Sequence, residues 1–407
     1  MNPKDQLFGH LELGPRDSIT ATMMLCIADP NPLKVNLGAG VYADENGKPV
    51  VFRAVRKAEE MIFHDPKHNH EYLPPFGHTN FIETAQNIVF GEDNELIKNK
   101  KIATIQTVSG SGALTNGLTL LKKSCPGVVY ISKPTWPVHG PLVASQGLPS
   151  REYPYLDPTT KSVDFKKMTD FLGTCPAGSI VILHGCAHNP TGSDLTNEQW
   201  DRLAVILQEN KLIPFVDLAY QGFATGDLDN DAYAVRLLAS KRFTFLVAQS
   251  FAKNFGLYGE RIGALHVVCQ DADSAKLVCN HLETIARNSY LCPPLHGALI
   301  VDTIWRNPEL RSEYKVQLAE VFARINQARV LLRAELEKLN VPGSWSHITD
   351  QRGMFSFTGL TTAQCGYLLQ SLSVYILASG RANMAGINPS NATRVAEAFK
   401  EAIEQNP

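Results

Sequence analysis

One loop of this chain places a primary amine and a permanent cation eight residues apart. The stretch Ser250-Phe-Ala-Lys253-Asn-Phe-Gly-Leu-Tyr-Gly-Glu-Arg261 follows an apolar run over 243–248, which the pattern predicts to be a strand. A lysine amine can form an imine with an aldehyde, and an arginine can hold a phosphate through two parallel hydrogen bonds. Pyridoxal phosphate carries both groups on one molecule. The loop therefore predicts a site for a cofactor of this kind.

Lys253 alone would be interpreted as a surface lysine, as most lysines are. Its neighbours are small, however, and small residues allow a bulky molecule to approach the backbone. The amine must lose its proton before it attacks an aldehyde, so a buried, electropositive site would suit it. Once a substrate amine replaces it, the free amine can move a Cα proton as general base.

Asp217 and Tyr220 follow a second apolar run, in Pro-Phe-Val-Asp217-Leu-Ala-Tyr220. A carboxylate at the carboxyl end of a parallel strand lies where open α/β sheets bind ligands. Placed against a pyridine nitrogen, Asp217 would keep that nitrogen protonated, and Tyr220 would donate to the ring oxygen O3′. The alternative is a helix-capping Asp followed by a half-buried Tyr.

The run Ser109-Gly-Ser-Gly112 leads into an apolar helical pattern. Backbone N–H groups at a helix N-terminus bind phosphate. The run is not a dinucleotide fingerprint, because Thr115 occupies the third glycine position, and it lacks the Gly-Lys-Ser/Thr of a Walker A motif. Alone it is equally compatible with a tight turn. Beside Arg261 it predicts a phosphate cup with Gly110 and Ser111 as donors.

His184 and His188 have the spacing of some metal ligands. Gly185 and the Asn189-Pro190 turn make this segment a loop rather than one face of a helix, and no Glu follows the first His as in HExxH. The sequence therefore predicts no metal here.

Composition excludes several classes of protein. The chain is 44% apolar and 19% charged, with a net charge of −2, which is typical of a folded enzyme and not of a nucleic-acid-binding protein. No apolar segment reaches the ~18 residues of a membrane span. The N-terminus resembles neither a signal peptide nor a transit peptide, and the eight cysteines form no CxxC pairs. We expect a cytoplasmic enzyme with small-molecule substrates.

The order of elements predicts an α/β fold. Apolar runs at 178–183, 212–216, 243–248 and 262–268 are predicted strands, and a capping box at Thr196 and Gln199 begins a helix that runs to about residue 210. This spacing indicates a largely parallel sheet. Residues 308–340 predict one long helix, and 354–357 and 374–377 predict strands of a smaller unit. At 407 residues, the chain is long enough for two domains.

From about Val35 to Arg381 these motifs, in order, resemble the aspartate aminotransferase family. The resemblance implies a fold-type I pyridoxal-phosphate transferase, with a mostly parallel seven-stranded sheet flanked by helices and a smaller α/β domain built from both termini. It implies an N-terminal arm and part of the small domain in 1–46, a large cofactor-binding domain in 47–318 and a small domain in 319–407. It also implies a homodimer with shared active sites, and cis bonds before Pro134 and Pro190.

Further cofactor contacts follow from the resemblance. Trp136 would stack on the ring with support from His139, although by itself Trp136 would be a core residue of a Pro-rich turn. Asn189 would donate to O3′, and Ser250 would also contact the cofactor. Tyr72 would reach across the dimer to the neighbouring phosphate.

Two arginines would select the substrate. Arg381 matches the residue that binds the α-carboxylate, and Arg287 matches the residue that reaches across the dimer to the distal carboxylate of aspartate or glutamate. Arginine suits planar, bidentate recognition of carboxylates. Gly40, with Trp136 and Asn189, would line the substrate site, and so would Phe355. The chain departs from the family pattern at Leu291 and Cys292, which replace Ser-Asn.

The implied reaction is a reversible ping-pong transfer of the amino group from L-aspartate to 2-oxoglutarate, giving oxaloacetate and L-glutamate. An aromatic or broad-range aminotransferase uses nearly the same residues. The alternative outside the enzymes is a binding or structural dimer of the same fold without catalytic activity. The intact Lys253, Asp217 and Arg261 argue against it.

Overall fold

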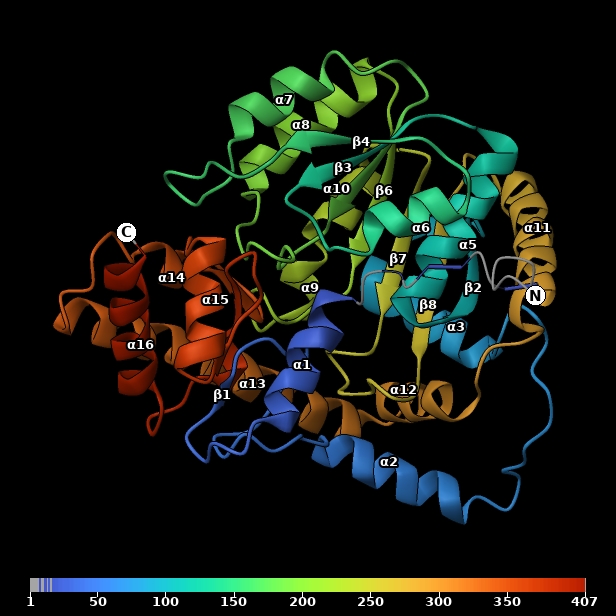
Figure 1. Ribbon diagram of the computed structural model, residues 1–407. Helices are drawn as coiled ribbons and strands as arrows, with labels where there is room; N and C mark the ends of the chain where they lie inside the picture. The colour runs from blue at the N-terminus through green and yellow to red at the C-terminus, as the bar shows by residue number, and fades with distance from the viewer. Residues whose placement is uncertain (1–6, 9–10, 13, 15–16, 407) are drawn as a thin grey trace.

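The computed structural model describes residues 7–8, 11–12, 14 and 17–406 (Figure 1). Its largest sheet has seven strands in the order β2-β8-β7-β6-β5-β3-β4, and β8 runs in the direction opposite to the other strands. The predicted mostly parallel sheet is therefore confirmed. The strands are β2 (Ile102–Val108), β3 (Val129–Lys133), β4 (Ser150–Pro154), β5 (Ile180–His184), β6 (Ile213–Leu218), β7 (Phe245–Ser250) and β8 (Ile262–Val268).

Helices cover both faces of this sheet, so successive residues of a strand enter different cores. In β7, Phe245 and Val247 join one apolar cluster, and Leu246 and Ala248 join the other. Such doubly buried strands are continuous apolar runs, which is why the sequence predicts them well. One face packs on α5 (Ser109–Ser124) and α11 (Ala272–Tyr290); the other packs on α3 (Thr79–Phe90), α8 (Asn197–Glu209), α10 (Tyr233–Ser240) and α12 (His296–Arg306).

The predicted helix after Thr196 is α8, and both hydrogen bonds of its capping box are present. Thr196 Oγ1 accepts from the Gln199 backbone N–H, and Gln199 Oε1 accepts from the Thr196 backbone N–H. The predicted long helix is α13 (Pro308–Lys338), which runs without interruption over 31 residues after an Asn307 cap. Both predictions are confirmed because they depend on short-range contacts.

A smaller unit combines both ends of the chain. β1 (Val35–Asn36) pairs in parallel with β10 (Val374–Tyr375), and β9 (Phe355–Phe357) pairs antiparallel with β11 (Arg381–Asn383). Helix α1 (Ser18–Ala28) packs on β1 and β10, while α15 (Thr362–Ser371) packs on β10 and on α16 (Ala392–Gln405) (Figure 1). α13 crosses residue 318, and the division of the chain at 46 and 318 stays a prediction. Within the described ranges, no helix is both long and apolar enough to cross a bilayer.

A buried histidine makes the fold sensitive to acid. His266 in β8 lies 3.0 Å from Thr104 Oγ1 and 2.9 Å from Gln249 Oε1, and burial lowers its pKa from 6.5 to about 3. Between these values the unfolded chain binds a proton that the folded chain does not. Stability therefore falls as the pH drops from 6.5 toward 3, by up to about 1.4 kcal/mol per pH unit.

We expect His266→Gln to flatten this dependence, since the variant has no group here to protonate in the unfolded chain. Urea unfolding measured from pH 7 to pH 4 tests this, with the exposed His281→Gln on α11 as control. Equal slopes for wild type and His266→Gln would contradict the prediction.

Candidate active site

A cavity of about 110 Å³ lies at the carboxyl end of the parallel strands, where open α/β sheets bind ligands. It brings together most of the residues that the sequence singled out, from five separate segments. Those at the cavity wall are Gly110, Ser111, Trp136, Asn189, Asp217, Tyr220, Ser250, Lys253 and Arg261, together with Ser109, Leu114 and Ala219.

Lys253 follows β7 directly, and its Nζ lies 5.2 Å from the centroid of the Tyr220 ring. Burial lowers the pKa of Lys253; the negative charge of Asp217 opposes this change, and the positive charges of Arg261 and Arg381 add to it. The amine is therefore neutral more often than a surface lysine, as attack on an aldehyde requires. Burial also raises the pKa of Tyr220, which keeps its hydroxyl protonated as a donor.

Asp217 lies near the end of β6, where it is 7% exposed. Burial would raise the pKa of Asp217, but the hydrogen bond from His139 Nε2 (3.2 Å) and the nearby positive charges hold that pKa below its usual range. His139 is itself held by Thr135 Oγ1, 2.8 Å from its Nδ1, and Thr135 Oγ1 lies 3.2 Å from His184 Nε2. The carboxylate is therefore ionised and oriented.

Sequence reasoning missed Thr135 and His184 as parts of this chain of contacts, because no local motif links residues 49 positions apart. The His184 and His188 rings lie 4.0 Å apart, and the His188 ring also stacks on Tyr155 at 4.0 Å. No group of three or more His, Cys, Asp or Glu side chains that would hold a metal ion occurs among the described residues.

Asn189 lies in the loop after β5, 5% exposed, and its Oδ1 has no hydrogen-bond partner within the described structure. A buried amide oxygen without a partner is unfavourable, so a hydrogen-bond donor on a molecule bound in the cavity would satisfy it. The peptide bonds before Pro134 and Pro190 are both cis, as predicted.

The start of α5 forms the floor of the cavity next to Arg261. The Ser109 N–H donates to the Arg261 carbonyl (2.9 Å), which joins this helix start to the loop after Lys253. Gly110 lies against Ser250, with only 3.0 Å between a Cβ built at Gly110 and the Ser250 Cβ. N–H groups in the first turn of a helix have no partner within the helix, so Gly110 and Ser111 present free donors for an anion.

This helix start depends on close backbone packing at Gly263 in β8. A Cβ built there would lie 2.4 Å from the Ser109 carbonyl carbon and 2.8 Å from the Gln249 oxygen. We expect Gly263→Ala to lower the free energy of unfolding by about 2 kcal/mol and to weaken binding of pyridoxal phosphate.

Thermal unfolding and cofactor titration measure both effects. Gly259→Ala is the matched control, because a Cβ there meets no atom within 4 Å. If Gly263→Ala binds the cofactor as tightly as Gly259→Ala does, the helix start does not depend on this packing.

Arg381 lies on β11, is 1% exposed, and packs on Phe355, whose ring meets that of Tyr220 at the cavity wall. Its Nη2 donates to the Gly38 carbonyl (2.7 Å), its guanidinium carbon lies 4.1 Å from the Phe355 ring centroid, and its Nε has no partner among the described residues. Burial lowers the pKa of Arg381 to about 10, so the group stays cationic at neutral pH. A buried cation with unused donors suits a carboxylate ligand. Gly40 follows in the same loop as Gly38, with open space where its Cβ would be.

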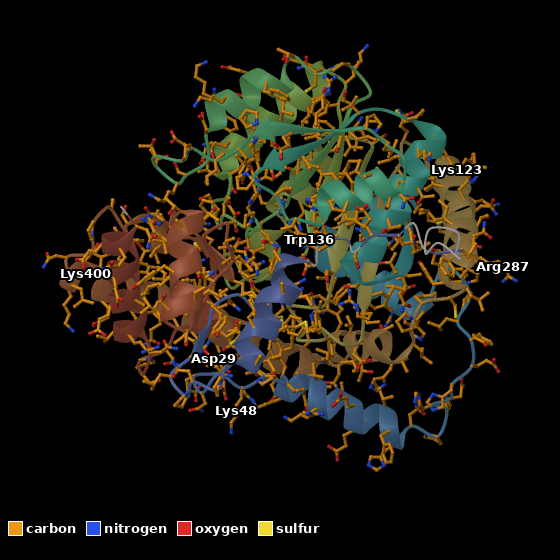
Figure 2. All side chains as sticks on the ribbon, in the orientation of Figure 1. Asp29, Lys48, Lys123, Trp136, Arg287 and Lys400 are labelled. Atoms are coloured by element: carbon orange, nitrogen blue, oxygen red, sulfur yellow. The ribbon has the colours of Figure 1, made fainter. Side chains whose placement is uncertain are left out.

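Two further predicted residues, like Gly40 and Arg381, are not part of the cavity wall. Tyr72 is 77% exposed, and Arg287 projects from the outer end of α11, far from the central Trp136 (Figure 2). Their predicted roles require a second subunit and stay predictions.

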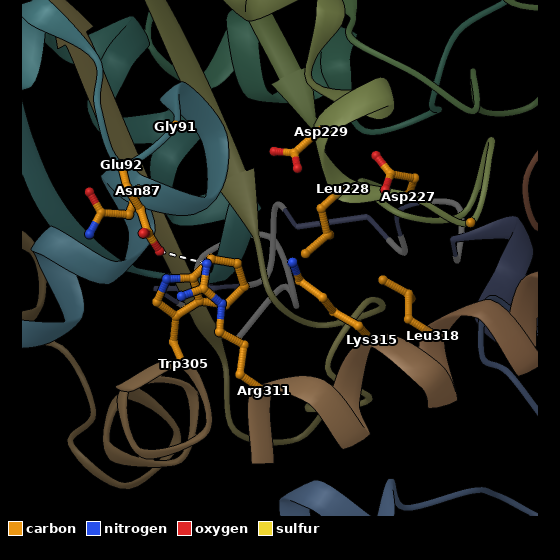
Figure 3. Close-up of a pocket in the computed structure, with 11 residues that line it drawn as sticks. Asn87, Gly91, Glu92, Asp227, Leu228, Asp229, Trp305, Arg311, Lys315 and Leu318 are labelled. Carbon is orange, nitrogen blue, oxygen red and sulfur yellow. Dashed lines mark ion pairs between the residues drawn. The ribbon is translucent and has the colours of Figure 1, made fainter. Parts of the chain in front are cut away.

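A second hollow of about 330 Å³ contains no predicted site residue (Figure 3). Its charged groups are largely paired with one another: Arg311 pairs with Glu92 (2.6 Å) and stacks on Trp305, and Asp229 pairs with Arg236. It offers no chemistry comparable to that of the cavity around Lys253.

Comparisons with known proteins agree with this geometry. The family Aminotransferase class I and II matches residues 32–399. The cytoplasmic aspartate aminotransferase of Oryza sativa subsp. japonica is 41% identical over 398 residues, which are 98% of each chain. The solved aspartate aminotransferase from Saccharomyces cerevisiae cytoplasm superposes with a TM-score of 0.96 at 41% identity, covering 98% of this chain and 99% of that one.

A third relative is the aromatic-amino-acid aminotransferase from Burkholderia pseudomallei, solved with covalently bound pyridoxal phosphate. It has a TM-score of 0.94 and 38% identity, and the match covers 98% of this chain and 99% of that one. The chain therefore belongs to the class I and II aminotransferases, enzymes that depend on pyridoxal phosphate.

Proposed function

We propose that the protein is an aspartate aminotransferase, which exchanges the amino group between L-aspartate and 2-oxoglutarate to give oxaloacetate and L-glutamate. One observation carries this proposal. Lys253, whose pKa is lowered, the ionised Asp217 and the start of α5 line one cavity. The buried Arg381, whose Nε has no partner among the described residues, lies near them. Aspartate aminotransferases that match 92–99% of this chain at 40–42% identity support it.

The residues present fit pyridoxal phosphate. Lys253 would hold its aldehyde carbon, Asp217 would keep a proton on its ring nitrogen, and Tyr220 and Asn189 would donate to its O3′. Trp136 would pack on the ring face. The residues for the phosphate are Gly110, Ser111, Ser250 and Arg261, with Tyr72 of a second subunit. When bound, the cofactor supplies an electron sink for the negative charge that develops at the substrate Cα.

The protein's own groups perform the proton transfer. Lys253 Nζ takes the Cα proton as general base and later returns it, which its lowered pKa favours near neutral pH. Asp217 stays ionised throughout, because His139 donates to it and Thr135 holds His139 in place. Arg381 binds the α-carboxylate and so holds the substrate in the cavity.

We further infer a cytoplasmic homodimer, in which each subunit lends Tyr72 and Arg287 to the other site. Exposed apolar side chains near the N-terminus support a partner contact: Leu7 is 78%, Phe8 70% and Leu11 67% exposed. Several relatives are named cytoplasmic. Within each subunit, a small domain divided from the large one near residues 46 and 318 would close over the substrate and exclude water.

Arg287→Ala tests the substrate. If Arg287 of a second subunit binds the distal carboxylate, kcat/KM for aspartate is expected to fall by about 10²-fold or more, while phenylalanine is affected far less. Lys276→Ala, which removes an exposed cation from the same helix, is the matched control. An unchanged kcat/KM for aspartate in Arg287→Ala would contradict the proposal.

One observation favours an aromatic or broad-range aminotransferase as the second candidate. Leu291 (φ 67°, ψ −65°) is the centre of a γ-turn closed by the Cys292 N–H and the Tyr290 carbonyl (2.8 Å), and it is 42% exposed. The turn places an apolar side chain four residues after Arg287, at a position where the family pattern has serine. Comparing turnover of aspartate with that of phenylalanine and tyrosine decides between the two, and a clear aromatic preference would favour the second.

A further inference from the structure

We propose that Arg329 is a positioning residue for the carboxylate site: it fixes the backbone at Phe355, and the Phe355 ring in turn sets the position of Arg381. This inference rests on the proposed function and adds a residue to it that lies outside the cavity.

Arg329 lies in the middle of α13 and is 1% exposed. Its Nη1 donates to the Ile348 carbonyl (2.8 Å), and its Nη2 donates to the carbonyls of Gly353 (2.8 Å) and Phe355 (2.5 Å). Burial lowers the pKa of Arg329 to about 9, opposed by the charge of Asp194, so it remains a cation at neutral pH. A buried cation bound to three carbonyls gives short, directional contacts that an apolar residue cannot replace.

The segment that Arg329 holds packs tightly on the loop that carries Asn189. The Arg352 N–H donates to the Gly192 carbonyl (2.6 Å). A Cβ at Gly192 would lie 2.6 Å from the Phe355 oxygen, and a Cβ at Gly353 would lie 2.4 Å from the Ala187 Cβ. Both glycines have positive φ. The Phe355 carbonyl therefore lies between α13 on one side and the Asn189 loop on the other, without room to shift.

The Phe355 ring connects the position of this backbone to that of Arg381. It lies 4.1 Å beneath the Arg381 guanidinium carbon and meets the Tyr220 ring edge-on, with centroids 5.8 Å apart. Within the described part of the chain, one hydrogen bond holds the Arg381 guanidinium, from Nη2 to the Gly38 carbonyl. The flat Phe355 ring therefore supplies much of the surface that orients Arg381, and a shift of its backbone would misplace the guanidinium.

The expected result is a change in carboxylate binding without a change in the cofactor site. In Arg329→Met, we expect KM for both aspartate and 2-oxoglutarate to rise about tenfold with kcat changed by less than about threefold, because Arg381 binds the carboxylate equally before and during reaction. Binding of maleate, a dicarboxylate without an amino group, should weaken by the same factor. The absorption of bound pyridoxal phosphate and its pH titration should stay as in the wild type.

Two further variants keep the test sharp. Arg329→Lys retains the charge but not the forked donors, and it should give a smaller rise in KM. Arg333→Met is the matched control, since Arg333 lies on the same helix but donates to the side chains of Thr349 and Glu337. Should Arg329→Met not fold, Arg329→Lys and Phe355→Leu replace it. Combined, these two should weaken maleate binding less than the product of their separate effects.

The inference is overturned if folded Arg329 variants bind maleate as tightly as the wild type, or if the two effects in the double variant multiply. It is also overturned if cofactor affinity and kcat fall while KM rises, since that pattern indicates a general loss of stability. A wild type that binds maleate and the cofactor but does not convert aspartate would contradict the proposed function and leave the role of Arg329 decided by the binding data.

Discussion

Replacing Lys253 by alanine is expected to lower kcat by at least about 10⁴-fold, because the change removes both the nucleophile and the general base. Among the described residues that line the cavity, Lys253 is the only lysine. Its neighbours in the described loop are small residues and the buried Phe251 and Phe255, and none of them carries an amine that could replace it. Steady-state turnover of aspartate and 2-oxoglutarate measures the loss.

The spectrum distinguishes loss of chemistry from loss of fold. Wild-type protein mixed with pyridoxal phosphate should show an absorption band near the visible range that changes when aspartate is added, and Lys253→Ala should lack this response. Lys123→Ala removes an exposed lysine from the end of α5 and should behave as the wild type. Turnover of Lys253→Ala within tenfold of the wild type would exclude Lys253 as the catalytic base.

Asp217→Asn is expected to lower kcat by about 10³-fold, since it removes a fixed negative charge where positive charge must be held in the reaction. The amide is close in size to the carboxylate and can still accept a hydrogen bond from His139 Nε2. In the wild type this nitrogen lies 3.2 Å from Asp217 Oδ2. Stability should therefore change much less than activity. The charge itself, rather than the packing of the side chain, is what the variant tests.

Asp217→Glu keeps the charge and should recover part of the activity. Asp170→Asn, at an exposed position that pairs with Lys166, is the control for removal of a carboxylate. If Asp217→Asn and Asp217→Glu lose activity equally, the position of the side chain matters and its charge does not.

The sequence by itself determined those features that depend on near neighbours. The β5, β6 and β7 strands are continuous apolar runs because helices bury both of their faces. The start of α8 follows from a four-residue capping box. Lys253 and Arg261 lie in one loop, so the sequence alone predicts that they are close together. Asp217 comes at the end of an apolar run, so its place at the carboxyl end of a parallel strand also follows from the sequence.

The tertiary structure decided whatever depends on residues far apart in the chain. The antiparallel direction of β8 follows from where the loop after Lys253 returns to the sheet, and no residue pattern within β8 encodes it. Thr135 and His184 meet across 49 positions to hold His139 against Asp217. In the sequence, Arg329 is one of many polar residues of a long helix. Only the fold brings it to the carbonyls of Ile348, Gly353 and Phe355. Short-range contacts leave their pattern in adjacent residues, whereas these arrangements exist only once distant segments have packed.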